Sequence, residues 1–222
     1  AGNRKTFTIS AWVKRSKLSY DYAYIITAGE YNQDQMAQFK FDSNDQLNIS
    51  GYASNGSKDF RVHTNRRFRD TSAWYHVMAA VDTTQATASN RVKVYVNGVQ
   101  ETSFSEATYP SQNYDTAFNL NGIQSNIGIR AGTATYFDGY MSHVHLADGT
   151  AYTPSTFGET DATTGIWKPK TSPSVTYGTN GFFLKFENSA AMGTDSSGNS
   201  NTFTVNGSMT QLIDTPSNVF AT

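Results

Sequence analysis

The segment Phe7-Thr8-Ile9-Ser10-Ala11-Trp12-Val13 decides the fold class of this 222-residue chain. Every second position in it is apolar: Phe7, Ile9, Ala11 and Val13. Because successive side chains of a β-strand point to opposite faces, this alternation places the four on one face. The segment therefore predicts a strand with one side in a hydrophobic core.

The same alternation recurs along the chain, whereas sustained helical periodicity is hard to find. It returns at Val92, Val94 and Val96 and again at Phe182, Leu184 and Phe186. Further strands are expected at 23–28, 37–41, 46–51, 74–81 and 140–146. Asn-Gly, the strongest short hairpin signal, occurs at 55–56, 97–98, 121–122, 180–181 and 206–207. We therefore predict an all-β fold with very little helix: a two-sheet antiparallel sandwich of the jelly-roll kind.

Two longer breaks interrupt the strand pattern. Segment 103–118 is a loop rich in Tyr, Ser and Asn, and segment 153–177 carries three of the five prolines. The second break could link two domains, but 178–211 holds only two or three expected strands, too few for a separate core. We predict one domain over 1–222, with 178–222 as a C-terminal hairpin segment that completes the sandwich.

Composition limits the function. With 17 basic and 18 acidic residues the net charge is −1, which argues against a nucleic-acid partner. No apolar run reaches the ~20 residues of a membrane span, so no membrane insertion is expected. The absence of cysteine excludes disulfides and thiolate metal sites. The first residues show no signal peptide and lead straight into a strand, so we expect a start cut from a longer chain.

Four ordered segments resemble the laminin G-like branch of the concanavalin A-like sandwiches. They are the strand 7–14 and the three sequences Ala73-Trp74-Tyr75-His76-Val77, Val92-Lys93-Val94-Tyr95-Val96-Asn97-Gly98 and Phe137-Asp138-Gly139-Tyr140-Met141-Ser142. The segment Asp195-Ser196-Ser197-Gly198-Asn199-Ser200-Asn201 resembles a turn that in many such domains precedes the first of these strands. The resemblance implies either a circularly shifted order or a second domain that this chain cuts short.

A second resemblance concerns the source. The arrangement that includes Phe157-Gly158-Glu159-Thr160-Asp161 and Trp167-Lys168-Pro169-Lys170 is similar to large structural proteins of marine and cyanobacterial phages. It implies a protein made in the host cytoplasm and located on the virion surface, with other virion proteins as partners and a homo-oligomeric assembly.

Glycoside hydrolases also use this sandwich, so an enzyme has to be considered. They place two carboxylates about 5–10 Å apart across the substrate. A strand supplies such pairs at i and i+2, yet no expected strand contains a comparable acidic run. We therefore expect no catalytic residues.

Two groups of residues suit either a metal ion or a purely structural role. His143 and His145 share a strand face with Met141 and could hold a metal, but polar residues on an exposed face are the simpler interpretation. His76 is expected to be buried and hydrogen-bonded. Asp195, Asn199 and Asn201 could supply oxygen ligands to calcium, the one cofactor considered. The same residues are also ordinary turn formers.

Side chains suited to binding occur in two groups. Arg61, Arg66, Arg67 and Arg69 form a basic cluster, and the interleaved Phe60 and Phe68 could suit nucleic acid or an acidic glycan. A charged outer strand that resists edge pairing is the simpler interpretation. Aromatic rings beside amides suit sugars and also subunit interfaces. The candidate glycan- or partner-binding residues are Tyr20, Tyr22, Tyr31, Tyr109, Gln112, Asn113 and Tyr114.

Three functional hypotheses follow. The first is a non-catalytic structural or adhesion module, a decoration or fibre protein that makes protein contacts on a bacteriophage particle. The second is a lectin-like module that binds host-surface glycan. The third is a glycan-cleaving enzyme.

Overall fold

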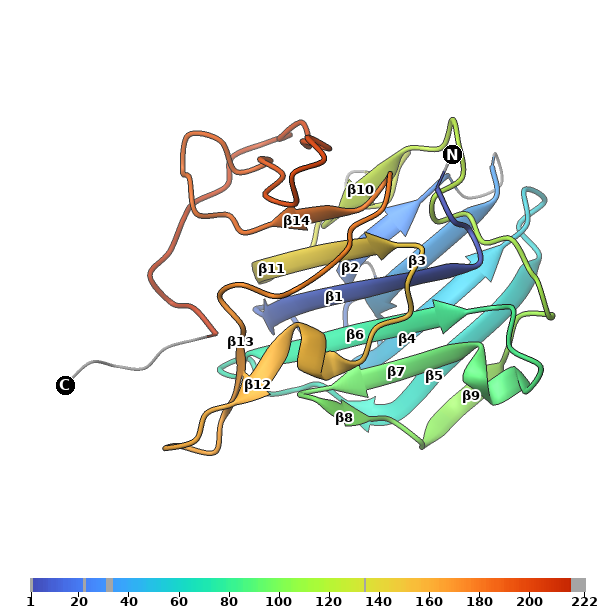
Figure 1. The fold of residues 1–222 in the computed structure, drawn as a ribbon, viewed down its shortest axis with the longest axis horizontal. Coiled ribbons are helices and arrows are strands. Elements are labelled where there is room, and N and C mark those ends of the chain that lie inside the picture. Colours follow the sequence, from blue (N-terminus) through green and yellow to red (C-terminus); the bar gives the residue numbers. More distant parts are fainter. Residues whose placement is uncertain (1, 22, 31–33, 134, 217–222) are drawn as a thin grey trace.

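The computed structural model describes residues 2–21, 23–30, 34–133 and 135–216. Two six-stranded antiparallel sheets dominate it (Figure 1). The first sheet runs in the order β14 (Phe182–Leu184), β11 (Gly139–Asp148), β1 (Thr6–Arg15), β6 (Tyr75–Asp82), β7 (Val92–Val96) and β8 (Val99–Gln100). The second runs β10 (Ser125–Ile127), β2 (Ala23–Ala28), β3 (Met36–Phe41), β4 (Gln46–Tyr52), β5 (Lys58–Arg67) and β9 (Phe104–Thr108).

The remaining elements are short. A two-stranded sheet pairs β12 (Gly158–Thr160) with β13 (Trp167–Pro169), and the helical turns are η1 (Ala88–Asn90) and η2 (Pro154–Thr156). The predicted all-β jelly-roll sandwich with very little helix is confirmed. None of the described helices is long and apolar enough to cross a membrane.

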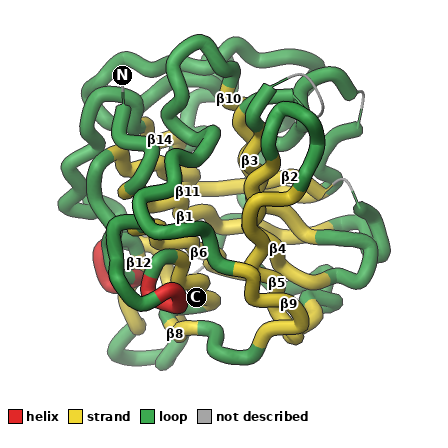
Figure 2. Tube along the Cα trace, turned by 90° about the vertical axis from the view of Figure 1, so that its right-hand side faces the viewer, coloured by secondary structure: helices red, strands yellow, loops and turns green. Residues whose placement is uncertain are grey.

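The core lies between the two sheets, which Figure 2 shows as separate layers. The first sheet contributes Phe7, Ile9, Ala11 and Val13, all fully buried as the alternation predicts. The second contributes alternate residues of β3, β4 and β5, among them Phe39, Ile49 and Phe60. The opposite side chains of these three strands face away from the first sheet, toward the outside of the sandwich.

Two strand expectations need correction. Segment 103–118 is not a loop throughout, because Phe104–Thr108 forms β9 against β5. Met141 does not share a face with His143. The pairing of β11 with β1 shifts register between Ser10 and Trp12, and His143 has φ 48°, so the strand bulges there. Met141 consequently packs against the core.

The outer face of the first sheet is covered by the segment that contains η2, β12 and β13. Trp167 stacks near His76, and Tyr177 stacks on His145. His76 and His145 point away from the core, toward the outer face of the first sheet. These contacts explain why both side chains are nevertheless buried.

The C-terminal segment adds one strand to the first sheet. β14 pairs with β11, and Phe182 and Leu184 enter the core. Phe186 has φ 60° and lies outside the strand, which ends at Leu184. Asp195 forms a single bridge to Leu184, and no strand follows among the described residues. The one-domain organisation with a completing hairpin stays a prediction.

Candidate functional site

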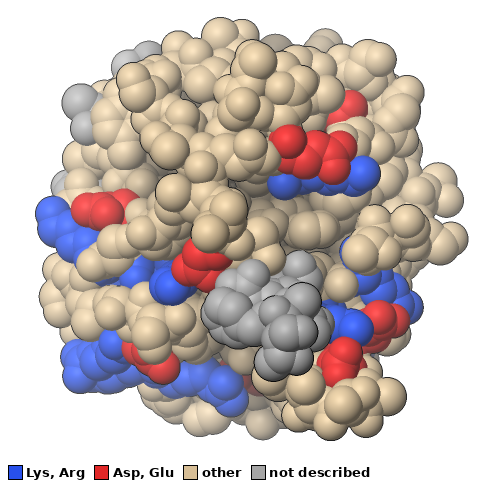
Figure 3. All heavy atoms as spheres, turned by 90° about the vertical axis from the view of Figure 1, so that its left-hand side faces the viewer, with Lys and Arg blue, Asp and Glu red and all other residues tan. Residues whose placement is uncertain are grey.

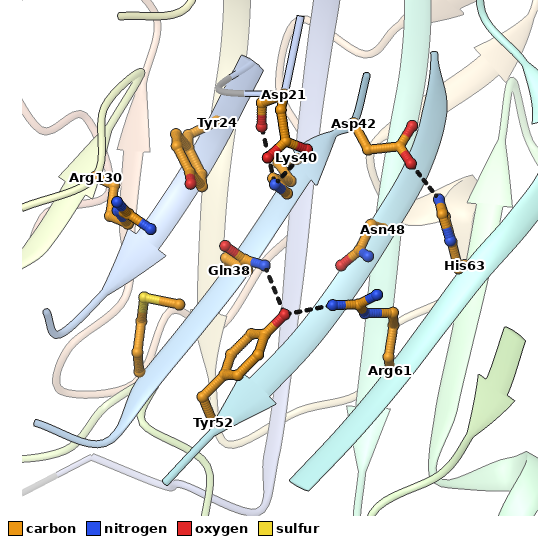
Figure 4. Close-up of a pocket in the computed structure, with 11 residues that line it drawn as sticks. Asp21, Tyr24, Gln38, Lys40, Asp42, Asn48, Tyr52, Arg61, His63 and Arg130 are labelled. Carbon is orange, nitrogen blue, oxygen red and sulfur yellow. Dashed lines mark hydrogen bonds and ion pairs between the residues drawn. The ribbon is translucent and has the colours of Figure 1, made fainter. Parts of the chain in front are cut away.

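The outer face of the second sheet carries a polar pocket, a cavity of about 440 Å³. Its floor consists of side chains from three neighbouring strands: Met36, Gln38 and Lys40 of β3, Asn48 and Tyr52 of β4, and Arg61 and His63 of β5. Tyr24 of β2, Asp21, Asp42 and Arg130 complete the walls (Figure 4). Strand alternation explains the composition, since the residues between these positions face the core.

Hydrogen bonds hold the middle of the pocket in place. Gln38 Nε2 donates to Ser50 Oγ at 2.9 Å and lies 3.4 Å from Tyr52 OH. Arg61 Nη2 donates to the same hydroxyl at 2.6 Å. A side chain from each of β3, β4 and β5 is thus tied to its neighbour, which fixes the pocket before any ligand arrives.

Two ion pairs close the end of the pocket opposite Tyr52 (Figure 4). Lys40 Nζ lies 3.1 Å from Asp21 Oδ1, and His63 Nε2 lies 3.0 Å from Asp42 Oδ2. Burial alone would raise the pKa of Asp42, but contacts with His63 and with the backbone amides of Gln46 and Asn44 lower it to about 2. Asp42 is therefore an anion over the whole ordinary pH range.

Asn48 and Arg61 each bring to the pocket a polar atom that is buried without a hydrogen-bond partner among the described residues. These atoms are Oδ1 of Asn48, whose residue is 2 % exposed, and Nε of Arg61. An unsatisfied buried polar group costs about 1–3 kcal/mol, so such atoms call for an explanation. One is an acceptor and the other a donor, which matches a ligand hydroxyl group.

The sequence-predicted tyrosine loop does not line this pocket. Tyr114 OH donates to Asp59 Oδ2 at 2.6 Å, and burial followed by that contact raises the pKa of Tyr114. Gln112 Nε2 donates to Thr84 O, and the Asn113 amide donates to Thr83 O. Tyr109 packs against the core and lines a smaller cavity of about 200 Å³ near β7 and β8. These contacts fasten the loop to the sandwich, and its binding role stays a prediction.

The early tyrosines are only partly placed. Tyr20 lies under Lys17, whose Nζ is 4.1 Å from the ring centroid, and it precedes the pocket residue Asp21. Tyr22 and Tyr31 lie outside the described residues.

The predicted calcium residues form a hydrogen-bonded turn. Asp195 Oδ1 accepts from the amides of Phe183 and Ser197, and Oδ2 accepts from Ser197 Oγ and the Asn201 amide. The side-chain amides of Asn199 and Asn201 both donate to Gly181 O. Both carboxylate oxygens therefore have protein donors. The described residues contain no cluster of His, Cys, Asp and Glu suited to a metal, and calcium binding, one of the two alternatives for this segment, stays untested.

The histidines of the first sheet have structural contacts. Trp167 Nε1, which only donates, lies 3.0 Å from His76 Nδ1, so the ring proton sits on Nε2 and points at Ser10 Oγ, 2.8 Å away. Burial, with a smaller effect of His143, lowers the pKa of His76 to about 3. His76 therefore cannot take a proton from Ser10. His145 Nδ1 lies 2.8 Å from Tyr177 OH, so its place is buried rather than on an exposed face.

The basic cluster is divided among different contacts. Arg61 belongs to the pocket, Arg66 pairs with Glu101 at 2.9 Å, and Arg69 pairs with Asp45 at 2.9 Å. β5 is also not an outer strand, because it pairs with β4 on one side and β9 on the other. The interpretation of the arginine cluster as a charged outer strand is therefore wrong, and the described arginines make separate local contacts.

Residues 2–157 match the family model described as the concanavalin A-like lectin/glucanases superfamily. The chain belongs to this family. No curated protein sequence matches it. The family description includes both lectins and glucanases. Membership therefore establishes the fold, and the activity has to be inferred from the residues of the site.

Solved structures resemble the chain at low sequence identity. The CBM40 module of the Ruminococcus gnavus IT-sialidase has a TM-score of 0.50 at 15% identity, covering 68% of this chain and 80% of that one. Domain 4 of AbnA, an arabinanase of Geobacillus stearothermophilus solved with arabinotriose, has 0.49 at 19% identity, covering 69% and 65%. A pentraxin of Limulus polyphemus has 0.45 at 18%, covering 68% and 67%.

Most of the pocket residues are absent from the sequence-based candidates. Gln38, Lys40, Asn48 and His63 are polar residues that alternate with buried ones, a pattern typical of any solvent-facing sheet surface. A signal was present nonetheless: long polar side chains repeat on three successive strands, 36–41, 46–52 and 58–67. Only the strand order, which the sequence does not provide, shows that they converge.

Proposed function

We propose that the chain is a non-catalytic adhesion module that binds a glycan in the polar pocket. The observation that carries this proposal is the pair of buried, unpartnered polar atoms in a preformed cavity, Asn48 Oδ1 and Arg61 Nε, which have no partner in the described part of the chain. A sugar hydroxyl can donate to the first and accept from the second. Membership of a superfamily that contains lectins supports the proposal.

The state of the pocket carboxylates favours binding over cleavage. A glycosidase needs one carboxyl group that is protonated and acts as general acid. Asp42, with its pKa lowered to about 2, is fully ionised, and Asp21 is held by Lys40. The Ser10 and His76 pair on the first sheet is excluded as a nucleophile and base by its tautomer.

A glycan array tests the proposal. The wild type should bind one group of related glycans, and Asn48→Ala should lose about tenfold or more in affinity, which is ~1.4 kcal/mol. Asn65→Ala is the matched control, because Asn65 is an exposed asparagine of the same sheet that bonds Ser103 and does not line the pocket. Absence of binding by the wild type, or equal loss in both variants, contradicts the proposal.

We also propose that this module works on the surface of a phage particle, in contact with other virion proteins and with copies of itself. The resemblance of segments 157–161 and 167–170 to phage structural proteins supports the location. Four apolar side chains of the C-terminal segment are exposed and support a protein contact there: Val205, Met209, Leu212 and Ile213. Mass spectrometry of purified particles tests the location, and light scattering tests self-association.

Charged side chains of both signs lie on this side of the molecule. On the face that carries the C-terminal segment, Lys and Arg lie beside Asp and Glu rather than in a single-sign patch (Figure 3). The chain also contains ion pairs between Lys14 and Asp214 and between Lys168 and Asp161, each at 2.7 Å.

A further inference from the structure

We infer that the polar pocket selects an anionic sugar unit, one that carries a carboxylate or a sulfate beside its hydroxyl groups. This inference rests on the proposed function and names the ligand class. It is carried by the charges that face the cavity, by the contacts that those charges already make, and by the surroundings of the Tyr24 ring at the cavity wall.

Cationic side chains outnumber anionic ones around the cavity. Lys40, Arg61 and Arg130 line the cavity, against the carboxylates of Asp21 and Asp42. At the rim Glu106 contacts both Lys58 and Arg61, so it adds one negative charge beside one further positive charge. The described groups around the cavity are therefore more positive than negative, although the whole chain carries a net charge of −1.

The pocket carboxylates already have partners within the protein. Asp42 Oδ2 lies against His63, and its Oδ1 accepts from the amides of Asn44 and Gln46 at 3.0 and 2.9 Å. Asp21 Oδ1 is held by Lys40. Both oxygens of Asp42 and one oxygen of Asp21 thus already have protein partners, which leaves these carboxylates less able to accept from ligand hydroxyl groups.

Arg61 keeps N–H donors that its contacts within the described residues do not use. Arg61 touches Tyr52 OH through Nη2 and Glu106 through Nη1 at 3.5 Å, and its Nε is buried without an acceptor among the described residues. A guanidinium offers more N–H groups than these contacts use. An oxyanion supplies several acceptors at once and forms the stronger, charge-assisted hydrogen bonds.

The aromatic ring at the wall also disfavours a neutral sugar. Lys40 Nζ lies 5.2 Å and the Arg130 guanidinium 5.8 Å from the centroid of the Tyr24 ring. Neutral pyranoses gain much of their affinity by stacking C–H groups on an open aromatic face. Here the ring instead positions two cations toward the cavity by cation–π attraction.

Asn48 allows the pocket to discriminate between an acidic sugar and a simple inorganic anion. Its buried Oδ1 can only accept, so the ligand must bring an O–H or N–H donor close to its acidic group. Inorganic sulfate lacks that donor, whereas a uronate or a sulfated sugar carries both. The adjacent positions of Asn48 and Arg61 in the pocket fit one sugar ring that spans both (Figure 4).

Isothermal titration calorimetry tests the inference with three tetrasaccharides: a polyuronate, a sulfated glycan and a neutral glucan, with inorganic sulfate as a fourth probe. We expect at least one acidic tetrasaccharide to bind tenfold or more tighter than the glucan. Its affinity should fall when NaCl rises from about 20 to about 200 mM, because salt screens charge. Comparison of the uronate and sulfate arms identifies the acidic group.

Arg61→Gln should weaken acidic-glycan binding about tenfold. The matched control Arg67→Gln, on the same strand but outside the cavity, should not change it.

If Arg61→Gln fails to fold, the salt dependence of wild-type binding still shows whether the ligand is recognised by charge. Binding of the glucan as tight as the acidic glycans, with loss in Asn48→Ala, overturns the inference and keeps the proposed function. Sulfate binding as tight as the sugars overturns it too. Binding of no glycan overturns both.

Discussion

Asn48 on β4 and Arg61 on β5 each leave one buried polar atom without a hydrogen-bond partner in the described part of the chain, and both line the same cavity. Asn48 pairs in register with His63, and Arg61 pairs with Ser50, so the two are diagonal neighbours on the outer face of the sheet. The proposed glycan site accounts for this arrangement, because a bound sugar would supply the missing hydrogen bonds.

A stability measurement follows from this arrangement. Asn48→Leu removes the unsatisfied acceptor and fills the space with apolar atoms, so the free energy of unfolding should rise by about 1 kcal/mol while glycan binding is lost. Urea unfolding checks the stability. A loss of more than about 1 kcal/mol would show that Asn48 is a structural residue rather than an acceptor kept free for a ligand.

Acid should destabilise the fold through His76. Its folded-state pKa of about 3 lies below the ordinary value of 6.5, so between these values the unfolded state binds a proton that the folded state does not. Stability is thus fully present above pH 6.5 and is lost as the pH falls toward 3. The slope from this one group approaches about 1.4 kcal/mol per pH unit.

Urea unfolding at about pH 7.5, 6.5, 5.5 and 4.5 measures how the free energy of unfolding changes with pH and so checks this slope. His145, whose pKa is also lowered by burial, adds to it. His76→Gln should be less stable at neutral pH and should show a shallower loss on acidification. Parallel curves for the wild type and His76→Gln would contradict the assignment.

The buried ion pair of Arg15 and Asp45 should be sensitive to removal of either charge. Both side chains are 1 % exposed, with Arg15 Nη2 2.9 Å from Asp45 Oδ1. Asp45→Asn leaves Arg15 charged and poorly compensated, which should cost about 3–5 kcal/mol in thermal or urea unfolding. Asp70→Asn, at an exposed turn, is the control and should cost less than about 1 kcal/mol.

Removal of calcium should leave the protein unchanged. The carboxylate of Asp195 already accepts four protein hydrogen bonds, so a bound ion would have to displace them. Melting curves with calcium and with a chelator should coincide. A rise in melting temperature with calcium, abolished by Asp195→Asn, would establish the site that the sequence pattern suggested.

Deletion of 178–222 should abolish cooperative folding. β14 covers the edge of β11, and Phe182 and Leu184 are among the buried core residues. Removal of two such side chains and a strand exposes an apolar edge and should cause aggregation. A soluble, cooperatively unfolding 1–177 fragment would show that the sandwich is complete without this segment.

Period-two alternation predicted the sandwich well, because a strand with one buried face has its register fixed by that face. The strands at 23–28 and at Val92–Val96 match the structure, and the Asn97-Gly98 turn joins β7 to β8 with φ 48° and 82°. The bulge at His143 could not be predicted from the sequence, because one extra residue in a strand does not produce a recognisable pattern of apolar and polar residues.

The site was harder to predict than the fold. The loop tyrosines were selected by residue type; Tyr109 packs against the core and Tyr114 donates to Asp59, and their binding role stays a prediction. The pocket instead comes from polar residues that look like an ordinary solvent-facing surface. What distinguishes them is convergence across β3, β4 and β5, which depends on strand order and twist rather than on any local pattern.

A crystal structure of the chain with a bound acidic oligosaccharide would show directly whether the polar pocket is the binding site. We expect a sugar in the polar pocket, with its oxygens within hydrogen-bond distance of Asn48 Oδ1 and Arg61 Nε. A sugar bound at the 109–114 loop or on the first sheet, with the pocket left vacant at saturating ligand, would contradict it.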